Sequence, residues 1–555
     1  MSSLKYASFK YRIFFIMILF FLLYACIGFN LFFIQIGQAH FFATLADKQY
    51  TVVTTQIPIR APILDRKGCI LAAAQDSVAA FIIPRLIKDH DRVNNFLGNY
   101  FPEALNRLYA YRQKHFMYVK RRLSSKEIEL IQNSGITDIK LLQEPNRYYP
   151  SETTASLVGI TNIDNQGVCG IEKVFDKQLS GTPTTITLKK DGRSEYFSIE
   201  SKINIKGNTG SSIMLTIDAT LQFLVYEELQ DALKSWSAQD GGALILDPSN
   251  GDILAMVSLP SFDPNSTKNL DIELTKNRCV TDMYEFGSVI KIFAALAAIE
   301  EKVVTPDEEI DCENTKSTII NGIRVNNWSS DGVIPFSKVL ARSNNIGIAK
   351  VTQRLGKKLY EHYRRLGFCQ KTNIALPGET IGFVTPPHAW SKQSIFSLSY
   401  GYEVSISLLQ LARAWGIIAN GGYFIQPRIT LSNPSSTTDP THSLCLLPMY
   451  KPATIRTIRS IAQETVDHGT AYRTHLDGYT IMGKTGTANL LKNGTYDKTR
   501  DIYSFAGIVE KGDYKRVIAV YLKNIPNNKH LFASKVVVPL FKSITQKMLI
   551  HEKVL

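Results

Sequence analysis

The sequence predicts an α+β protein that is held at a membrane by one N-terminal helix. Three observations support this fold class. Residues 13–34 contain no charged side chain, β-hairpin patterns stand at both ends of the region after residue 215, and helical patterns lie between those hairpins. Strands from the two ends would pair in one antiparallel sheet, with helices packed on both of its faces.

Length and composition limit the alternatives. A chain of 555 residues predicts two or more domains, and 45% apolar with 20% charged residues is typical of a globular protein. The net charge of +14 is spread along the chain without a basic run, so it favours an anionic membrane or cell-wall polymer over nucleic acid. The seven cysteines contain no C-x-x-C pair. We therefore expect no metal and no cofactor.

The apolar run predicts a single membrane anchor. Its 22 residues are enough to cross a hydrocarbon core of roughly 30 Å as a helix. Lys5, Lys10 and Arg12 precede it, whereas Lys48 is the only Lys or Arg at 35–59, so the positive-inside rule places the N-terminus in the cytoplasm. A cleaved signal peptide is the rival, but its apolar core usually has about 7–15 residues. We predict a tail at 1–12, an anchor at 13–36 and an extracytoplasmic remainder.

The region 37–215 is predicted as an elongated, mainly β pedestal domain. Residues 60–72 show two apolar runs around the turn at 65–68, and further turn-rich stretches occur at 147–150 and 167–172. A short helical pattern at 173–179 ends at Ser180 and Gly181. Nothing here pairs a nucleophile with a base, so this part is expected to be a spacer or a docking module.

A second domain is predicted at 216–555. Residues 215–218 form a short strand, and Asp218 is placed to cap a helix that extends to about residue 235. One β-hairpin is predicted at 242–247 with 252–258, and a second at 503–509 with 516–522. Between them, a helix is predicted at 405–418, with a glycine-rich stop at 419–422.

Ser288 and Lys291 are the first candidate catalytic residues. The strongly helical, apolar run 292–299 follows them directly, and Gly287 marks its start. Residues three apart on a helix share a face, so a hydroxyl and an amine would lie side by side in a buried place. Alone, Ser-x-x-Lys is too common to carry a function.

Two later segments complete a pattern. Ser343 and Asn345 form Ser-x-Asn, and the strand-like run 481–488 contains Lys-Thr-Gly. In this order, Ser-x-x-Lys, Ser-x-Asn and Lys-Thr-Gly are the signature set of serine β-lactamases and penicillin-binding proteins. The candidate residues are Ser288, Lys291, Ser343, Asn345, Lys484, Thr485, Gly486 and Thr487.

Chemistry explains these residue types. A serine hydroxyl attacks an amide only if a base takes its proton, and no Gly-x-Ser-x-Gly elbow is present, so Lys291 is the expected base. A free lysine is protonated at neutral pH, but burial and the nearby charge of Lys484 would lower its pKa. Ser343 would then pass a proton to the leaving amine.

The remaining candidates would bind substrate. Asn345 would hold the substrate amide, Thr485 and Thr487 would offer hydroxyls to a carboxylate, and Gly486 would let an extended peptide lie along the strand. The oxyanion would lie between the backbone N–H groups of Ser288 and Thr487.

With these motifs in place, the sequence resembles the class B penicillin-binding proteins, the peptidoglycan D,D-transpeptidases. Residues 60–72 are similar to that family's Arg-Gly-x-Ile-x-Asp-Arg-x-Gly segment, and 147–181 and 277–285 resemble its division-specific, FtsI-type members. Departures stand at Phe286, where proline is usual, at residues 289–290 and at residues 400–405.

The resemblance implies a function. The substrate would be pentapeptide stems that end in D-Ala-D-Ala, cross-linked through a Ser288 acyl-enzyme during septal wall synthesis, and β-lactams would acylate the same serine. The implied partners are a membrane glycan polymerase and division proteins. The implied location is the bacterial inner membrane, with the catalytic domain in the periplasm.

Several alternatives compete with this interpretation. A class A β-lactamase would need a Glu-x-x-Leu-Asn segment, which does not occur between Ser343 and Lys484. A bifunctional class A penicillin-binding protein would need a glycosyltransferase signature, which is also missing. A D,D-carboxypeptidase and a non-catalytic divisome scaffold stay open.

Overall fold

The computed structural model describes almost the whole chain. The described residues are 3–56, 58–111, 116–190, 197–205, 207–431, 448–492, 494–527 and 531–554. They form two compact units, of which the first comprises Met1–Pro58 and Gly181–Thr209 and the second Ile59–Ser180 and Gly210–Leu555. Each unit is described by itself.

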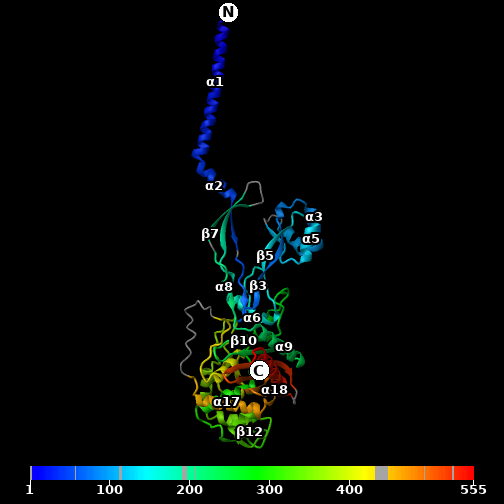
Figure 1. Ribbon diagram of the computed structural model, residues 1–555, viewed down its shortest axis with the longest axis vertical. Coiled ribbons are helices and arrows are strands. Elements are labelled where there is room, and N and C mark those ends of the chain that lie inside the picture. The colour runs from blue at the N-terminus through cyan, green and yellow to red at the C-terminus, as the bar shows by residue number, and fades with distance from the viewer. Residues whose placement is uncertain are drawn as a thin grey trace. The chain divides into compact units, whose positions relative to one another are not determined.

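The first unit combines an apolar helix with a small sheet (Figure 1). The helix α1 covers Ser3–Phe32 and continues through a π-helical turn, η1, at Phe33–Gly37. Within it, Phe9–Gly37 is long and apolar enough to cross a membrane, which confirms the predicted apolar helix. After α2 comes a three-stranded antiparallel sheet; these elements are α2 Ala39–Tyr50, β1 Thr51–Gln56, β6 Thr184–Lys190 and β7 Phe197–Ile205.

The second unit begins with the predicted hairpin. Strands β2 (Ile63–Leu64) and β3 (Ile70–Ile82) pair in antiparallel fashion, and β3 continues the sheet on to β4 and β5. Three helices pack against this sheet around a separate apolar core, which the sequence patterns did not predict. The added elements are α3 His90–Tyr100, α4 Pro102–Ala110, β4 Met117–Lys120, α5 Ser125–Ser134 and β5 Lys140–Tyr148.

A buried ion cluster joins the segments singled out at 60–72 and 147–172. Glu172, in α7 (Gly170–Val174), accepts hydrogen bonds from Arg60 Nε at 2.7 Å and from Arg147 Nε at 2.6 Å. All three side chains are almost fully buried. Because a buried charge is costly unless it is paired, these residues depend on one another. The predicted helix at 173–179 is divided between α7 and α8 (Asp176–Ser180).

The predicted antiparallel sheet of the second domain is confirmed. Its strand order is β10-β9-β19-β18-β17, so β9 from the beginning of the domain pairs with β19 from its end. Along β9 and along β19, successive side chains point to opposite faces of the sheet, as strand geometry requires. The strands are β9 Asp240–Leu246, β10 Ile253–Leu259, β17 Thr480–Lys492, β18 Thr495–Lys511 and β19 Tyr514–Pro526.

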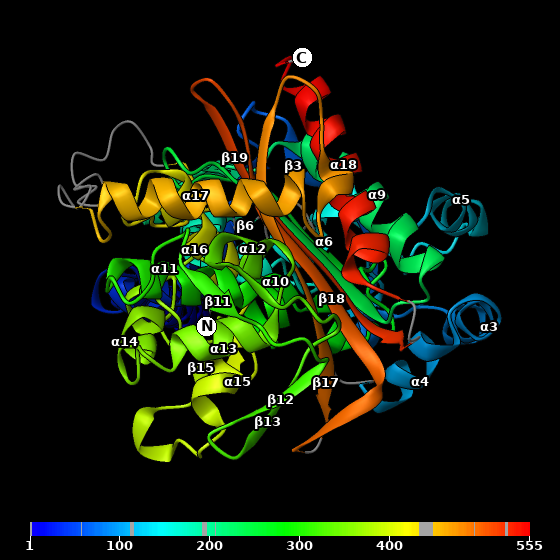
Figure 2. The same ribbon diagram turned by 90° about the horizontal axis from the view of Figure 1, so that it is seen from below.

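Helices cover both faces of this sheet (Figure 2). On one face, α9 (Ala219–Ser235) and α18 (Ala533–His551) pack against Ala243, Ile245 and Val520. On the other, α16 (Leu408–Ala419) packs against β9 and β19, in one cluster with Leu244, Leu246 and Val517. The helix α11 (Lys291–Glu300) joins this cluster through the contact of Phe293 with Trp415 of α16. This second face carries the candidate site.

Two helix starts can be compared with their predicted positions. Asp218 caps α9 as predicted, since its side chain accepts hydrogen bonds from the N–H groups of Thr220 and Leu221. The helix predicted from residue 405 begins at Leu408 instead. Ser407 provides the cap, with a reciprocal bond to Gln410, while Ser405 belongs to the short strand β16 (Val404–Ser405).

Candidate active site

The candidate nucleophile lies on a tight turn that packs against the edge strand β17. Gly287–Ile290 form a 3₁₀ turn, η5, directly before α11. Gly287 has φ +59°, and a side chain there would bring Cβ within 2.4 Å of the Thr487 carbonyl oxygen. Only glycine fits such a position. Ser288 is half-buried at the start of the turn, whereas Lys291 is fully buried.

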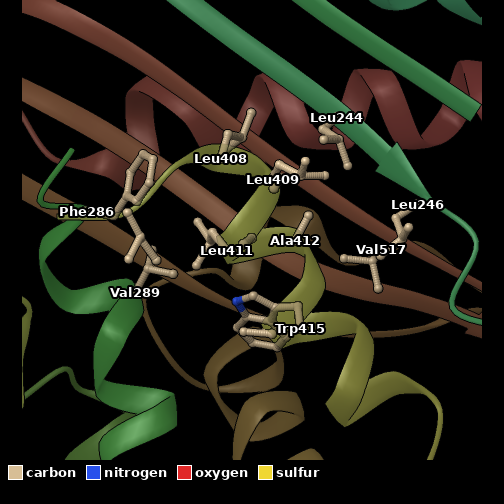
Figure 3. Close-up of a cluster of buried hydrophobic side chains, with 14 of the residues drawn as sticks. Leu244, Leu246, Phe286, Val289, Leu408, Leu409, Leu411, Ala412, Trp415 and Val517 are labelled. Atoms are coloured by element: carbon tan, nitrogen blue, oxygen red, sulfur yellow. The ribbon is translucent and has the colours of Figure 1, made fainter. Parts of the chain in front are cut away.

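Phe286 anchors this turn in the core (Figure 3). Its ring is fully buried in one cluster with Val289 and with Leu408 and Leu411 of α16. It also lies 6.0 Å, centroid to centroid, from the ring of Tyr521 on β19. The phenylalanine that replaces the family's usual proline is therefore a packing residue. It fixes the turn by burial instead of by a restricted φ.

Lys291 joins the first two motifs. Its Nζ donates hydrogen bonds to the Ser343 carbonyl oxygen at 2.6 Å and to Asn345 Oδ1 at 2.5 Å, and Ser343 Oγ lies 3.2 Å from it. The structure thus brings together three predicted residues that are 52 and 54 positions apart in the chain.

The environment of Lys291 favours its neutral form. Burial lowers the pKa of Lys291 well below its ordinary value, and the positive charge of Lys484 lowers it further. Burial is the larger of these two causes, both of which are predicted from the sequence. Burial also lowers the pKa of Lys484 to about 7. Lys484 therefore carries only a partial charge at neutral pH.

Ser343 lies in a strained loop between two short helices. These are α12 (Phe336–Ala341) and α13 (Asn345–Thr352), and Ser343 has φ +56°. A residue with a Cβ pays about 1–2 kcal/mol for the left-handed conformation. The Asn344 side chain caps α13 by accepting a hydrogen bond from Gly347 N at 2.9 Å. The strain turns both the carbonyl and the hydroxyl of Ser343 toward Lys291.

The third motif lies on β17. Lys484 is fully buried and donates to the Thr485 carbonyl oxygen at 3.2 Å, while Thr487 is exposed. At Gly486 a Cβ would meet the Phe286 carbonyl oxygen at 2.1 Å, so glycine lets β17 approach the nucleophile turn. Among the described residues β17 pairs only with β18, so its other edge has no strand partner.

Sequence reasoning missed several residues beside these motifs. Thr470 shares a hydrogen bond of 2.8 Å with the hydroxyl of Thr485, although it lies 15 positions upstream and outside any motif. Asn327 Oδ1 accepts from the Asn345 N–H at 3.0 Å, and Asp331 accepts from Asn344 Nδ2 at 2.7 Å. Asparagine and aspartate in a polar loop carry no signal of such contacts before the fold is known.

Comparison with known families identifies this arrangement. Residues 241–546 match the penicillin binding protein transpeptidase domain, and residues 55–215 match the penicillin-binding protein dimerisation domain. The chain therefore belongs to the penicillin-binding proteins of class B, and its enzyme class is that of a serine-type peptidoglycan D,D-transpeptidase.

Named relatives agree with this assignment. The chain is 30% identical to the probable peptidoglycan D,D-transpeptidase PbpC of Pseudomonas aeruginosa, over 96% of this chain and 94% of the relative. It is 29% identical to the peptidoglycan D,D-transpeptidase FtsI of Escherichia coli, over 87% and 82%. A crystal structure of penicillin binding protein 3 from Mycobacterium tuberculosis with aztreonam is similar at a TM-score of 0.67, with 26% identity over 90% of this chain and 98% of the other.

Proposed function

We propose that Ser288 is the nucleophile of a D,D-transpeptidase that cross-links peptidoglycan stem peptides. Its Oγ attacks the carbonyl carbon between the two D-Ala residues of a donor stem, the new C–O bond forms an acyl-enzyme, and the C–N bond to the terminal D-Ala breaks. An amine of a second stem then attacks the acyl carbon, forms the cross-link and releases Ser288.

One observation carries this proposal: a fully buried lysine, one turn from a half-exposed serine, is held by Ser343 and Asn345. The lowered pKa of Lys291 supports its role as the base that accepts the Ser288 proton. Ser343 Oγ, 3.2 Å from the Lys291 amine, is suited to hand a proton to the departing D-Ala nitrogen. In the second step, the attacking amine would lose a proton and Ser288 Oγ would regain one.

The edge strand is proposed to bind the donor. A partly charged Lys484 and the hydroxyls of Thr485 and Thr487 suit the terminal carboxylate. Gly486 lets the strand that would pair with the extended peptide lie against the nucleophile turn. The backbone N–H groups of Ser288 and Thr487 would stabilise the oxyanion. Asn345 would hold the substrate amide through the proton of Nδ2 that Asn326 does not take.

We further propose a septal role and an inner-membrane location. The chain would consist of a cytoplasmic tail at 1–12, an anchor at 13–36, a pedestal at 37–215 and a periplasmic catalytic domain at 216–555. Support comes from the basic residues before the apolar helix and from the similarity to FtsI. The partners would be a membrane glycan polymerase and division proteins, and β-lactams would acylate Ser288.

Covalent labelling tests the nucleophile. The full-length chain in detergent should react with a fluorescent penicillin, and Ser288→Ala should not. Ser266→Ala, at an exposed serine, is the matched control and should label like the wild type. Labelling of a folded Ser288→Ala variant would contradict the assignment.

A donor–acceptor assay tests the reaction. The chain is incubated with a pentapeptide donor ending in D-Ala-D-Ala and with an amine-bearing stem as acceptor. Cross-linked product should predominate over the tetrapeptide. Release of D-Ala without cross-linking would favour the D,D-carboxypeptidase, and no turnover by a chain that binds penicillin would favour a scaffold.

A further inference from the structure

A loop outside the three motifs contacts every residue of the Ser-x-Asn segment except Ser343. This loop, residues 326–331, follows strand β13 (Ile323–Asn326) of the β12–β13 hairpin and is called here the bracing loop. Its five hydrogen bonds to residues 342–345 are Trp328 Nε1 to Arg342 O at 3.1 Å, Arg342 Nη1 to Asp331 Oδ1 at 3.1 Å, Asn344 Nδ2 to Asp331 Oδ2 at 2.7 Å, Asn345 N to Asn327 Oδ1 at 3.0 Å and Asn345 Nδ2 to Asn326 O at 2.8 Å.

Asn327 and Asp331 of the bracing loop are held in place by further hydrogen bonds. Asn327 is 8% exposed, and its Nδ2 donates to the Ser329 carbonyl oxygen at 2.8 Å, which leaves Oδ1 directed at the Asn345 N–H. The Asp331 side chain is 5% exposed and also accepts from Ser329 Oγ at 2.8 Å and from Arg342 Nη1 at 3.1 Å. Both side chains are therefore rigid acceptors.

The Ser-x-Asn segment needs such support because its geometry is unfavourable by itself. Ser343 is held at φ +56°, a conformation that a free loop would leave. While it is held, the Ser343 carbonyl and the Asn345 amide oxygen both lie within 2.6 Å of Lys291 Nζ. A relaxed loop would move both acceptors away and admit water to the amine.

We propose that Asn327 and Asp331 are positioning residues for the acylation step. They hold Asn344 and Asn345, and through them Ser343, in the arrangement that buries Lys291 and keeps its amine ready to accept the Ser288 proton. The inference rests on the proposed function, because it assigns the two residues to the base of that same site.

The contacts favour positioning over general support of the fold. The helices α12 and α13 are held without the bracing loop. Val339 and Leu340 of α12 and Ile348 of α13 are buried in the main apolar cluster of the domain, and Asn344 caps α13. The bracing loop instead contacts the short connection between the helices. Loss of Asn327 or Asp331 should therefore disturb the site more than the stability of the domain.

The experiment compares two truncations with two conservative variants in the detergent-solubilised full chain. Asn327→Ala and Asp331→Ala remove the acceptors. Asn327→Asp and Asp331→Asn each retain an oxygen that can accept from Asn345 or Asn344. Glu309→Gln, on the neighbouring strand β11 (Glu309–Asp311), removes an exposed carboxylate outside the bracing loop and is the matched control. Stopped-flow acylation by a fluorescent penicillin separates the binding constant from the acylation rate constant, and circular dichroism reports folding.

We expect each alanine variant to lower the acylation rate constant by about 10- to 100-fold, with the binding constant within about two-fold of the wild type. The acid limb of the pH–rate profile should move up by about half a pH unit, because water reaching Lys291 relieves the burial that lowers its pKa. Lys484 is the charged group that acts on this amine and is unchanged in all variants. Asn327→Asp and Asp331→Asn should recover most of the rate.

Three results would overturn the inference. One is a folded alanine variant with a wild-type rate constant and profile. Another is a loss of rate that follows only the unfolded fraction. The third is that the conservative variants fail as badly as the alanines. If the wild type itself shows no Ser288-dependent labelling, the proposed function falls first and the inference with it, so the two failures are distinguishable.

Discussion

The amine of Lys291, the first residue of α11, donates a hydrogen bond of 2.5 Å to Oδ1 of Asn345, the first residue of α13. The same amide donates through Nδ2 to the Asn326 carbonyl oxygen. Both ends of the Asn345 side chain are thus committed, and its orientation is fixed with the oxygen toward the lysine. A neutral acceptor at this place holds the amine without adding a charge that would keep it protonated.

This relationship predicts the effect of Asn345→Asp. A carboxylate beside Lys291 favours the ammonium form, so the pKa of Lys291 should rise by about 1–3 units and acylation at pH 7 should fall by about 100-fold. The rate should recover as the pH is raised. The pH profile of penicillin acylation measures both, and an unshifted acid limb would contradict the electrostatic argument.

The two lysines predict a bell-shaped profile for acylation. Lys291 must lose its proton, so the rate rises with pH through its lowered pKa, whereas Lys484 must keep its charge to attract the substrate carboxylate. Since the pKa of Lys484 is about 7, the basic limb should begin there in the free enzyme. Lys484→Arg stays charged across this range, so a folded variant should lose that limb. Identical basic limbs in both proteins would exclude Lys484 as its source.

Gly287→Ala should be far more damaging than an alanine at an open left-handed glycine. The new Cβ would lie 2.4 Å from the Thr487 carbonyl oxygen, so β17 or the turn must move, and we expect a loss of at least about 2 kcal/mol together with acylation. Gly512 shares the φ of +59° but has no atom within 4 Å of its Cβ position. Gly512→Ala should cost only about 1 kcal/mol. Equal melting temperatures would refute the steric explanation.

Arg60→Ala tests the buried ion cluster. It leaves the fully buried Glu172 with one arginine fewer, which should cost about 3–5 kcal/mol of the unfolding free energy. Lys276→Ala breaks an exposed pair with Glu273 and should cost less than about 0.5 kcal/mol. Denaturant unfolding followed by circular dichroism measures the unfolding free energy of both variants. A small decrease for Arg60→Ala would mean that water replaces the guanidinium.

The sequence predicted the sheet and the site residues because both leave local or ordered patterns. Short apolar runs on either side of turns marked β9, β10, β18 and β19, and the three motifs identified the residues that surround Lys291. The small polar and aromatic residues of the bracing loop follow no period, and their contacts exist only once β13 lies beside α13. The helices α3, α4 and α5 were missed because short amphipathic turns between strands are weak signals.

Phe286 shows how the fold explains a departure from a family pattern. From the motif alone, a phenylalanine before Gly287 had no evident purpose. In the structure its ring fills the space between the nucleophile turn and Tyr521, and its carbonyl oxygen accepts from Ser504 Oγ at 3.1 Å. These contacts are made by residues more than 200 positions downstream, so the sequence around Phe286 could not predict them.

The strand order has a consequence for biosynthesis. β19 lies between β9 and β18, yet it is made of residues 514–526, close to the end of the chain. A nascent chain that stops before Tyr514 contains every residue proposed for catalysis but lacks the strand that joins the two halves of the sheet. Catalysis therefore has to wait until β19 has been made and has paired with both β9 and β18.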